Sequence, residues 1–435
     1  MAAAVWSDLA GNFKDVFASK YSKILPSFAI LQEDLPYKTA AKTGEQYSQA
    51  VLTRRSHGFT YLAPQAGLVT LNSIIPTKMV EAKLQGSQII GRDGIEYESA
   101  FASVGGKQAF KPGMKLVVES LWESHRHRLE ADVLYGQTNL GVVSGAPAAN
   151  VITLTTASWA PGLWVGMEGA ELEIFSADGT TQRAGIGAAS QYTIVSVDLD
   201  ARTITVDDDQ NVADTDVIQF RGAFTESGGG GSYSNMAGVI KWLTNTGTIA
   251  NISASTYNTW KANSVSAGSG PFSFDLVLQG TAKASVKGQM GRMKAYCHPQ
   301  AFANAISDLS AAVRRPSNEV KKYELGAEAI TFHTGSGTVE IVAHPMMKEG
   351  LCPVLSMASG EDDNDKQGGA FFRLGAQDMT FVAPYVAGPA PLDDTGFFWQ
   401  IPDTNGLEIR TYSHQAVFSP KPGRSFIVTG IVNDV

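Results

Sequence analysis

The stretch KPGMKLVVESLWESHRHRLEADVLYG, residues 111–136, has the clearest helical pattern in the sequence. Lys111-Pro112-Gly113 at its start breaks any preceding helix or strand. Gly136 at its end is a typical helix C-cap residue. Between these breaks, apolar side chains recur at steps of three and four, the spacing of one helix face. They are Met114, Val117, Val118, Leu121, Trp122, Leu129 and Val133, with His125 in register. The pattern predicts a long helix over 114–137 that lies on a core.

Polar side chains occupy the opposite face of this expected helix: Glu119, Glu123, Arg126, Arg128 and Glu130. The segments before it have other patterns. Residues 6–25 carry an apolar stripe at helical spacing that Pro26 ends, which predicts an amphipathic helix. From about Arg54 to Phe110, short apolar runs such as Val69-Thr70-Leu71 alternate with glycines, which predicts a long β-hairpin or extended flap.

The segment after the helix, about residues 141–225, is rich in strand-forming residues. Strands are expected around 151–154, 171–175, 192–197 and 203–206, with a turn at 198–202 between the last two. We interpret this segment as a small β-barrel or sandwich inserted into the main domain. The run Gly228-Gly229-Gly230-Gly231-Ser232 is then expected to be a flexible seam where the chain leaves it.

The remaining chain mixes helical and extended patterns. Tyr257, Trp260 and Lys261 have helix-like spacing, and residues 291–313 are expected to form a strand followed by a helix that begins near Pro299. Residues 329–332 and 339–342 flank the turn 333–337, which predicts a β-hairpin. The C-terminal hundred residues continue as mixed strands and loops.

Composition narrows the classes of function. The 435 residues carry 34 Lys and Arg against 42 Asp and Glu, a net charge of −8, so the basic excess of a nucleic-acid reader is missing. No segment approaches the ~18 apolar residues that span a bilayer. The two cysteines, Cys297 and Cys352, are too few for a disulfide framework and are expected to be buried free thiols in a reducing cytoplasm.

No catalytic, cofactor-binding or metal-binding constellation emerges from the sequence. Residues 185–190 approach a dinucleotide fingerprint, but Ser190 replaces the last glycine and a strand follows. Gly105-Gly106-Lys107 lacks the Ser or Thr of a phosphate loop, because Gln108 follows. We therefore expect no enzyme activity and no cofactor.

The titratable clusters favour ordinary structural roles. His125 is expected to be packed on the apolar helix face, and His127 to be solvated. Two acidic groups are interpreted as solvated turns because they lack the pattern of a calcium loop. The first comprises Asp207, Asp208, Asp209, Asp214 and Asp216, and the second Glu361, Asp362, Asp363 and Asp365.

The order of elements resembles the Hong Kong 97-type fold of tailed-bacteriophage major capsid proteins. An N-terminal arm, a long two-stranded flap and a long helix precede an α/β body. Three stretches are similar to recurrent parts of that family: 238–261, 293–307 and 326–355. Each stretch is a degenerate pattern and none is diagnostic alone. The resemblance rests mainly on the fact that the three stretches occur in the same order as in the family.

The resemblance implies an α+β fold with defined parts. Residues 1–55 would be the N-arm, 56–110 the E-loop, and 111–140 the spine helix of the P-domain. Residues 141–227 would be an inserted β-domain, which the minimal fold lacks. Residues 228–390 would form the A-domain with parts of the P-domain, and 391–435 the last P-domain strands.

The resemblance also implies a function and partners. The chain would assemble in the host bacterial cytoplasm into hexamers and pentamers of an icosahedral virion shell, without touching a membrane. The shell would enclose double-stranded DNA and contact it without sequence preference. A separate scaffolding protein and a portal are implied, because the N-terminal region is too short for a fused scaffolding domain; a decoration protein is compatible with the resemblance.

Six cations of the flap are candidates for contacts between subunits, although solvated charges are the simpler interpretation. They are Arg54, Arg55, Lys78, Lys83, Arg92 and Lys107. Two other functions remain open. A tail or baseplate protein would lack the long helix between a flap and an α/β body, whereas a hydrolase with an accessory β-domain would need a pocket with convergent titratable groups.

Overall fold

The computed structural model describes residues 26, 28–39, 47–64, 67–96, 113–147, 150–179, 181–183, 191–207, 211–227, 230–307, 329–335, 337–357, 371–381, 398–400 and 406–433. The chain divides into two compact units. Unit 1 comprises Met1–Ser27, Ile90–His125 and Phe381–Tyr412, and unit 2 comprises Phe28–Ile89, Arg126–Thr380 and Ser413–Val435. The expected helix at 6–25, the glycine motifs at 105–108 and 185–190, and the acidic residues 361–365 lie outside the described residues.

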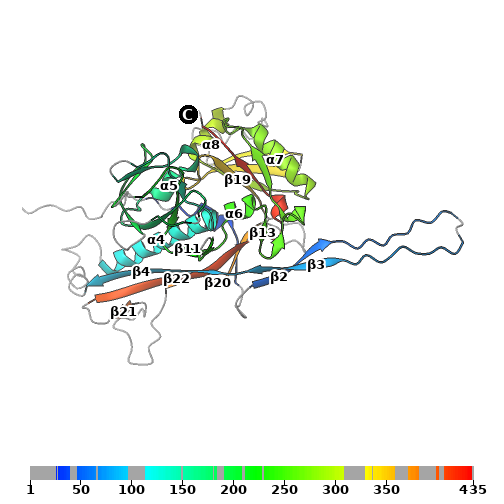
Figure 1. Cartoon of the computed structure of the whole chain (residues 1–435), viewed down its shortest axis with the longest axis horizontal. Coiled ribbons are helices and arrows are strands. Elements are labelled where there is room, and N and C mark those ends of the chain that lie inside the picture. The colour runs from blue at the N-terminus through cyan, green and yellow to red at the C-terminus, as the bar shows by residue number, and fades with distance from the viewer. Residues whose placement is uncertain are drawn as a thin grey trace, which may run out of the picture. The chain divides into compact units, whose positions relative to one another are not determined.

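The long helix is confirmed as α4, Gly113–Tyr135 (Figure 1). In unit 2 its second half buries Leu129, Val133 and Leu134, as the periodicity predicts. One assignment on this helix is wrong: Glu130, expected on the polar face, is fully buried. Its carboxylate accepts hydrogen bonds from the backbone N–H groups of Leu31 (2.7 Å) and Gln32 (2.9 Å) in helix α2, Ile30–Asp34.

Asp132, also on α4, makes the stability of the protein depend on pH. Burial raises the pKa of Asp132 to about 6 from its usual 3.8, although the Arg128 charge and a hydrogen bond from Asn235 oppose this rise. The native state then binds more protons than the unfolded state between about pH 4 and 6, so stability falls as pH rises through this window. Urea unfolding of Asp132→Asn should lack this fall, and the variant should be more stable at pH 7 by up to about 3 kcal/mol. Parallel pH profiles for the two proteins would contradict this expectation.

A six-stranded antiparallel sheet follows α4, in the order β5-β10-β7-β8-β9-β6. The two edges meet: Ser144 N donates to Thr153 O (2.8 Å), and Thr155 N donates to Val142 O (2.9 Å). The sheet therefore closes on itself. The strands are β5 (Gly141–Val142), β6 (Val151–Thr153), β7 (Glu171–Phe175), β8 (Tyr192–Asp198), β9 (Thr203–Val206) and β10 (Val217–Phe220), with short helices at Thr156–Ser158 (η2) and Pro161–Trp164 (α5).

The expectation of a flexible seam is wrong for the second part of the glycine run, while Gly228 and Gly229 lie outside the described residues. Strand β11, Phe224–Ser227, pairs antiparallel with β12, Gly230–Tyr233, so Gly230 and Gly231 belong to a hairpin. A Cβ atom at Gly231 would lie 2.0 Å from the ring of Phe224. Glycine is required at 231 because an aromatic ring covers the backbone there.

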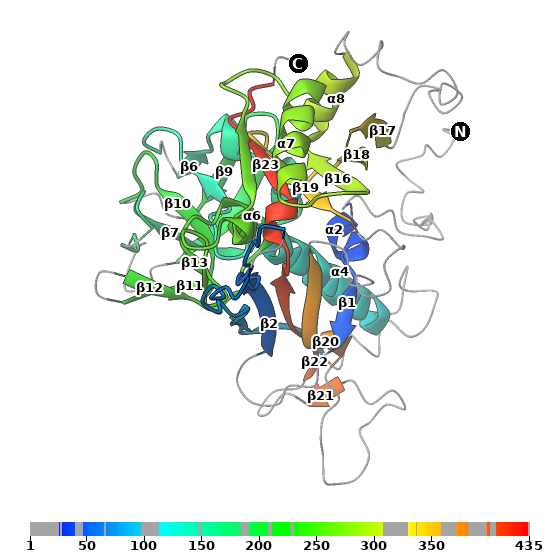
Figure 2. The ribbon, with the colours of Figure 1, turned by 90° about the vertical axis from the view of Figure 1, so that its right-hand side faces the viewer.

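A second six-stranded sheet, of mixed direction, has the order β15-β23-β19-β16-β18-β17. Helix α7, Phe274–Val286, contacts β15 and β23, and α8, Pro299–Ser307, contacts β18 (Figure 2). The strand and helix expected near Pro299 and the hairpin β17–β18 are confirmed. The strands are β15 (Asn263–Ser266), β16 (Met293–Cys297), β17 (Ala329–Thr334), β18 (Gly337–Ala343), β19 (Leu351–Ser356) and β23 (Phe426–Thr429).

The segment between the two sheets contains less helix than its spacing indicates. It begins with α6, Val239–Thr244, and continues as the small hairpin of β13, Thr248–Ile249, and β14, Ile252–Ser253. Trp260 then lies in a single 3-10 turn, η3 (Asn258–Trp260), and its indole N–H donates to Ile249 O (3.3 Å). The aromatic spacing reflects packing of Trp260 against Trp242, with ring centroids 5.9 Å apart, and not a helix.

Helix α7 packs so closely on the second sheet that one position excludes any side chain. A Cβ atom at Gly280 would lie 2.1 Å from the ring of Phe426, which is fully buried in β23. Gly280→Ala should therefore lower the free energy of unfolding by about 1 to 3 kcal/mol, although alanine favours a helix by about 1 kcal/mol. Urea unfolding measures this difference, and an unchanged or increased stability would show that Phe426 moves aside freely.

The remaining strands include a third sheet and the flap. Strand β1 (Tyr37–Thr39) runs parallel to β20 (Phe372–Phe381) in unit 2, and β21 (Phe398–Gln400) runs antiparallel to β22 (Gly406–Phe418) in unit 1. Strands β20 and β4 (Ser87–Glu96) also pair with β22. The flap is formed by β2, Tyr47–Arg54, and β3, Lys78–Leu84, and a 3-10 turn, η5, lies at Pro422–Arg424.

Candidate assembly surface

The β2–β3 hairpin is anchored to unit 2 at its base. Ala82 is fully buried, and Tyr47 and Leu84 are nearly so. Lys83 N donates to Ala250 O (3.1 Å), in the turn between β13 and β14. Beyond these contacts the two strands stay paired, with Leu52 opposite Met79, and an isolated bridge joins His57 to Ile75. Figure 1 shows the two segments continuing side by side beyond β2 and β3 to a distant tip.

Large apolar side chains are exposed along the outer part of this hairpin. More than half of those exposed in the described part of the chain lie between Leu52 and Met79. Tyr61 is 96% exposed, Ile74 89% and Phe59 73%. A two-stranded hairpin has little stability of its own in water, and apolar patches of this kind mark surfaces that another molecule covers. We call residues 52–79 the apolar tip.

The apolar tip has its own internal order despite its exposure. Asn72 Nδ2 donates to Phe59 O (2.8 Å), and Asn72 N donates to the Thr60 hydroxyl oxygen (2.8 Å). Arg54 donates from a guanidinium nitrogen to Pro76 O (3.2 Å). These three bonds join the two segments of the tip, and burial against another molecule would add to their stability.

The cations expected at subunit contacts have different surroundings. Arg55 is exposed and forms no ion pair with any described residue, and Lys83 forms only a 3.9 Å surface pair with Glu81. A hydrogen bond with Lys78 lowers the pKa of the Tyr257 hydroxyl, which places Lys78 against its own subunit. Lys107 lies outside the described residues. Contacts of these cations with a neighbouring subunit stay a prediction.

Arg92 has a partner within unit 1. Its Nε lies 2.5 Å from an oxygen of Glu408, and Arg410 contacts the other oxygen of the same carboxylate. Burial opposes ionisation of Glu408, but the hydrogen bonds from Arg410 and Arg92 outweigh it, and the pKa of Glu408 is lowered. Arg92 therefore already neutralises a carboxylate of its own chain.

The charged residues singled out from sequence are thus not the most distinctive feature of the flap. The apolar side chains of the tip, including Tyr61, Leu68 and Ile74, are more distinctive because no part of the chain that the structure describes covers them. Their apolar character is visible in the sequence. Whether such residues pack inward or face solvent depends on tertiary structure, which the local pattern does not determine.

Three titratable residues singled out from the sequence have buried contacts within the subunit. His125 is buried as expected, with Nδ1 2.8 Å from the Thr411 hydroxyl oxygen. The expectation of a solvated His127 is wrong: its Nε2 lies 3.0 Å from Gly162 O, and burial lowers its pKa. Asp216, expected in a solvated turn, is fully buried and binds the Arg183 guanidinium through two 2.8 Å contacts.

The described residues contain no group of three His, Cys, Asp or Glu side chains placed to hold a metal ion. Cys297 and Cys352 are buried and free, as expected, and burial raises the pKa of both thiols, which keeps them protonated and unreactive. Within the same described part, no helix is long and apolar enough to cross a membrane.

Comparison with known proteins gives structural matches only. No family model matches the sequence, and no curated protein matches it. A chain of the cyanophage A-1(L) capsid asymmetric unit matches 96% of this chain over 97% of its own length, with 9% identity and a TM-score of 0.52. A chain of the native GTA particle capsid (8% identity, 99% and 100% coverage, TM-score 0.48) and the SrpI encapsulin of Synechococcus elongatus PCC 7942 (6%, 99% and 96%, 0.44) also match.

The match to the cyanophage capsid extends over nearly the whole of both chains, so the similarity concerns the complete fold and not one shared motif. The chain is a mixed α+β protein with the fold of a phage capsid subunit. The resemblance read from the order of its elements is confirmed at the level of the fold.

Proposed function

We propose that this chain is the major capsid protein of a tailed bacteriophage, which builds an icosahedral shell from many copies of itself. The observation that carries the proposal is the apolar tip, residues 52–79, which the subunit exposes instead of packing against its own body. A protein with the fold of a phage capsid subunit and such a surface is suited to covering the tip with a neighbouring copy. The function is structural, and we propose no catalytic activity.

The finer assignments extend this proposal. Residues 56–110, which include most of the apolar tip, would be the E-loop of a Hong Kong 97-type subunit, and α4 would be its spine helix. Strands β15 to β19 would belong to the A-domain with parts of the P-domain, residues 228–390, and β23, which pairs with β15 and β19, would belong to the last P-domain segment, residues 391–435. The closed sheet of β5 to β10 would be the inserted β-domain. Its buried side chains belong to the same apolar cluster as those of α4 and Trp242. The inserted domain would therefore stabilise the main domain by packing against it.

The proposed partners follow from the same assignment. The subunits would form hexamers and pentamers around packaged double-stranded DNA, in the virion and after assembly in the host cytoplasm. The net charge of −8 is compatible with a shell protein that binds the packaged DNA only weakly. A separate scaffolding protein and a portal would take part in assembly.

Electron microscopy and light scattering of the purified full-length protein test the proposal. Closed shells, or capsomers of five or six subunits, are the expected result. Shells that carry a cargo protein and no DNA when isolated from their natural source would instead indicate an encapsulated compartment. A stable monomer or dimer at concentrations of about 100 µM would contradict self-assembly.

A further inference from the structure

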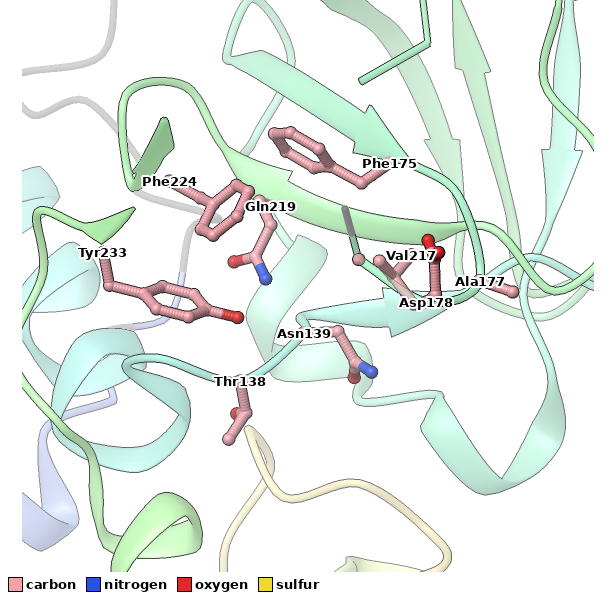
Figure 3. A pocket seen from close by; sticks show the side chains of 10 residues that line it. Thr138, Asn139, Phe175, Ala177, Asp178, Val217, Gln219, Phe224 and Tyr233 are labelled. Atoms are coloured by element: carbon pink, nitrogen blue, oxygen red, sulfur yellow. The ribbon is translucent and has the colours of Figure 1, made fainter. Parts of the chain in front are cut away.

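A second surface feature lies in the closed sheet, away from the apolar tip. A pocket of about 220 Å³ is bounded by β7, β10, the β11–β12 hairpin and the segment that follows α4 (Figure 3). All of its lining residues belong to unit 2. Neither the fold comparison nor the proposed assembly function assigns a role to it.

One wall of the pocket is aromatic. The rings of Phe175 and Phe224 meet edge to face with centroids 5.0 Å apart, and those of Phe224 and Tyr233 lie 4.8 Å apart. Gly231 makes this wall possible, because any side chain there would collide with the Phe224 ring. The hairpin thus holds the Tyr233 ring, which is 37% exposed, at the edge of the pocket.

The other lining side chains include polar ones. Gln219 on β10 is only 5% exposed, and its side-chain amide forms no hydrogen bond with any residue that the structure describes. Figure 3 shows this amide next to the Phe224 and Tyr233 rings, with Asn139 farther along the lining. The amide nitrogen and oxygen are open to the pocket, where water or the hydroxyl groups of a ligand can bond to them.

Two further polar groups line the pocket. Asn139 Oδ1 accepts a hydrogen bond from Lys348 Nζ (2.7 Å), which fixes the orientation of the Asn139 amide. The Asp178 carboxylate lines the rim and accepts a hydrogen bond from the Ser176 hydroxyl. Next to Asp178, Gly179 has φ +69° with no atom within 4 Å of its Cβ position, so the rim is open at this turn.

The chemistry of the lining narrows the ligand class. Among the described residues that line the pocket there is no Lys, Arg or His, so a phosphate or another anion would contact no cationic side chain of this lining. Amides donate and accept hydrogen bonds, and a carboxylate accepts them, which together match the alternating needs of neighbouring hydroxyl groups. Aromatic rings offer a flat apolar surface for the C–H face of a sugar ring.

We propose that this pocket binds one unit of a neutral saccharide, which would pack on the exposed Tyr233 ring and bond to the amides of Gln219 and Asn139. The inference is independent of the assembly function, because no residue of the apolar tip takes part. A particle that carries this site on its outer face would adhere weakly to glycans at many points at once.

Saturation-transfer NMR of the full-length protein with glucose, galactose, mannose and N-acetylglucosamine tests the site. At least one of these sugars should bind with a Kd on the order of 1 mM, as expected for a ligand of about a dozen heavy atoms. Gln219→Leu and Tyr233→Ala should each weaken binding at least about tenfold. Because Tyr233→Ala removes a ring that packs on Phe224, Asp178→Asn provides a third variant at an exposed position that cannot fail by unfolding the hairpin.

Asp200→Asn is the matched control, because Asp200 is an exposed carboxylate in the β8–β9 turn of the same sheet and lines no part of the pocket. It should bind sugars as the unchanged protein does. Three results would overturn the proposal: no transfer from any of the four sugars, equal binding by all the pocket variants, or a preference for tetramethylammonium, which would identify an aromatic cation site instead. Assembly should be unaffected by Gln219→Leu, so failure of this site leaves the assembly proposal standing.

Discussion

Replacing three side chains of the apolar tip, in the variant Leu68→Ser, Leu71→Ser and Ile74→Ser, should abolish shell formation while the subunit stays folded. All three are exposed in the subunit, so their loss costs the fold little. In a shell, burial of three such side chains against a neighbour contributes roughly 4 to 9 kcal/mol per tip before ordering costs are subtracted. Size-exclusion chromatography with light scattering would then show small species only.

The control for this variant is Val286→Ser with Met290→Ser, two side chains that are similarly exposed, at 87% and 78%, but lie at the end of α7 and just beyond it. The control should assemble normally, and thermal melts of the unassembled subunits should agree among the three proteins. Normal shells from the tip variant would show that the tip contributes nothing to assembly.

Glu130→Ala should produce the largest loss of subunit stability, about 3 to 5 kcal/mol, because it leaves the partners of a buried carboxylate unpaired. Glu130 accepts hydrogen bonds from Leu31 N and Gln32 N and lies 2.8 Å from His344 Nε2, with both side chains of this pair fully buried. Helix α2 begins after Ala29, which supplies no side-chain cap, so Glu130 also replaces the missing cap. Urea unfolding of the subunit measures the loss.

Glu33→Gln provides the comparison within the same region. Glu33 pairs with Arg126 at 2.8 Å, but the Glu33 side chain is 72% exposed, so its loss should cost less than about 1 kcal/mol. If the two variants lost equal stability, the buried network around Glu130 would not have the importance that its geometry indicates.

The elements that the sequence predicted are those with a strong local period. Helix α4 and the hairpin β17–β18 appear where the periodicity and the turn residues place them. Helix α7 was not anticipated. Three of the five buried positions on it, Gly280, Thr281 and Ala284, are small or polar, and only Phe274 and Val277 are large and apolar. Such a face carries little hydrophobic signal, although Phe426 packs directly on it.

The errors concern residues whose environment is set by distant segments. Glu130 is buried by residues almost 100 positions away, and Asp216 by Arg183 on another strand connection. The residues next to Glu130 and Asp216 in the sequence do not indicate that these distant segments bury them. The same limit applies to the apolar tip: the pattern revealed a flap, but only the folded subunit shows that its apolar side chains are left uncovered.

Photo-crosslinking from the apolar tip tests directly whether the tip contacts a second copy of the chain. A photoreactive phenylalanine analogue at position 68, in the purified full-length protein under assembly conditions, should give covalent dimers and higher ladders after illumination. Mass spectrometry should place the partner peptide in a second copy of the chain. A product crosslinked only within one chain, or no crosslink at all at about 100 µM protein, would contradict assembly through this surface.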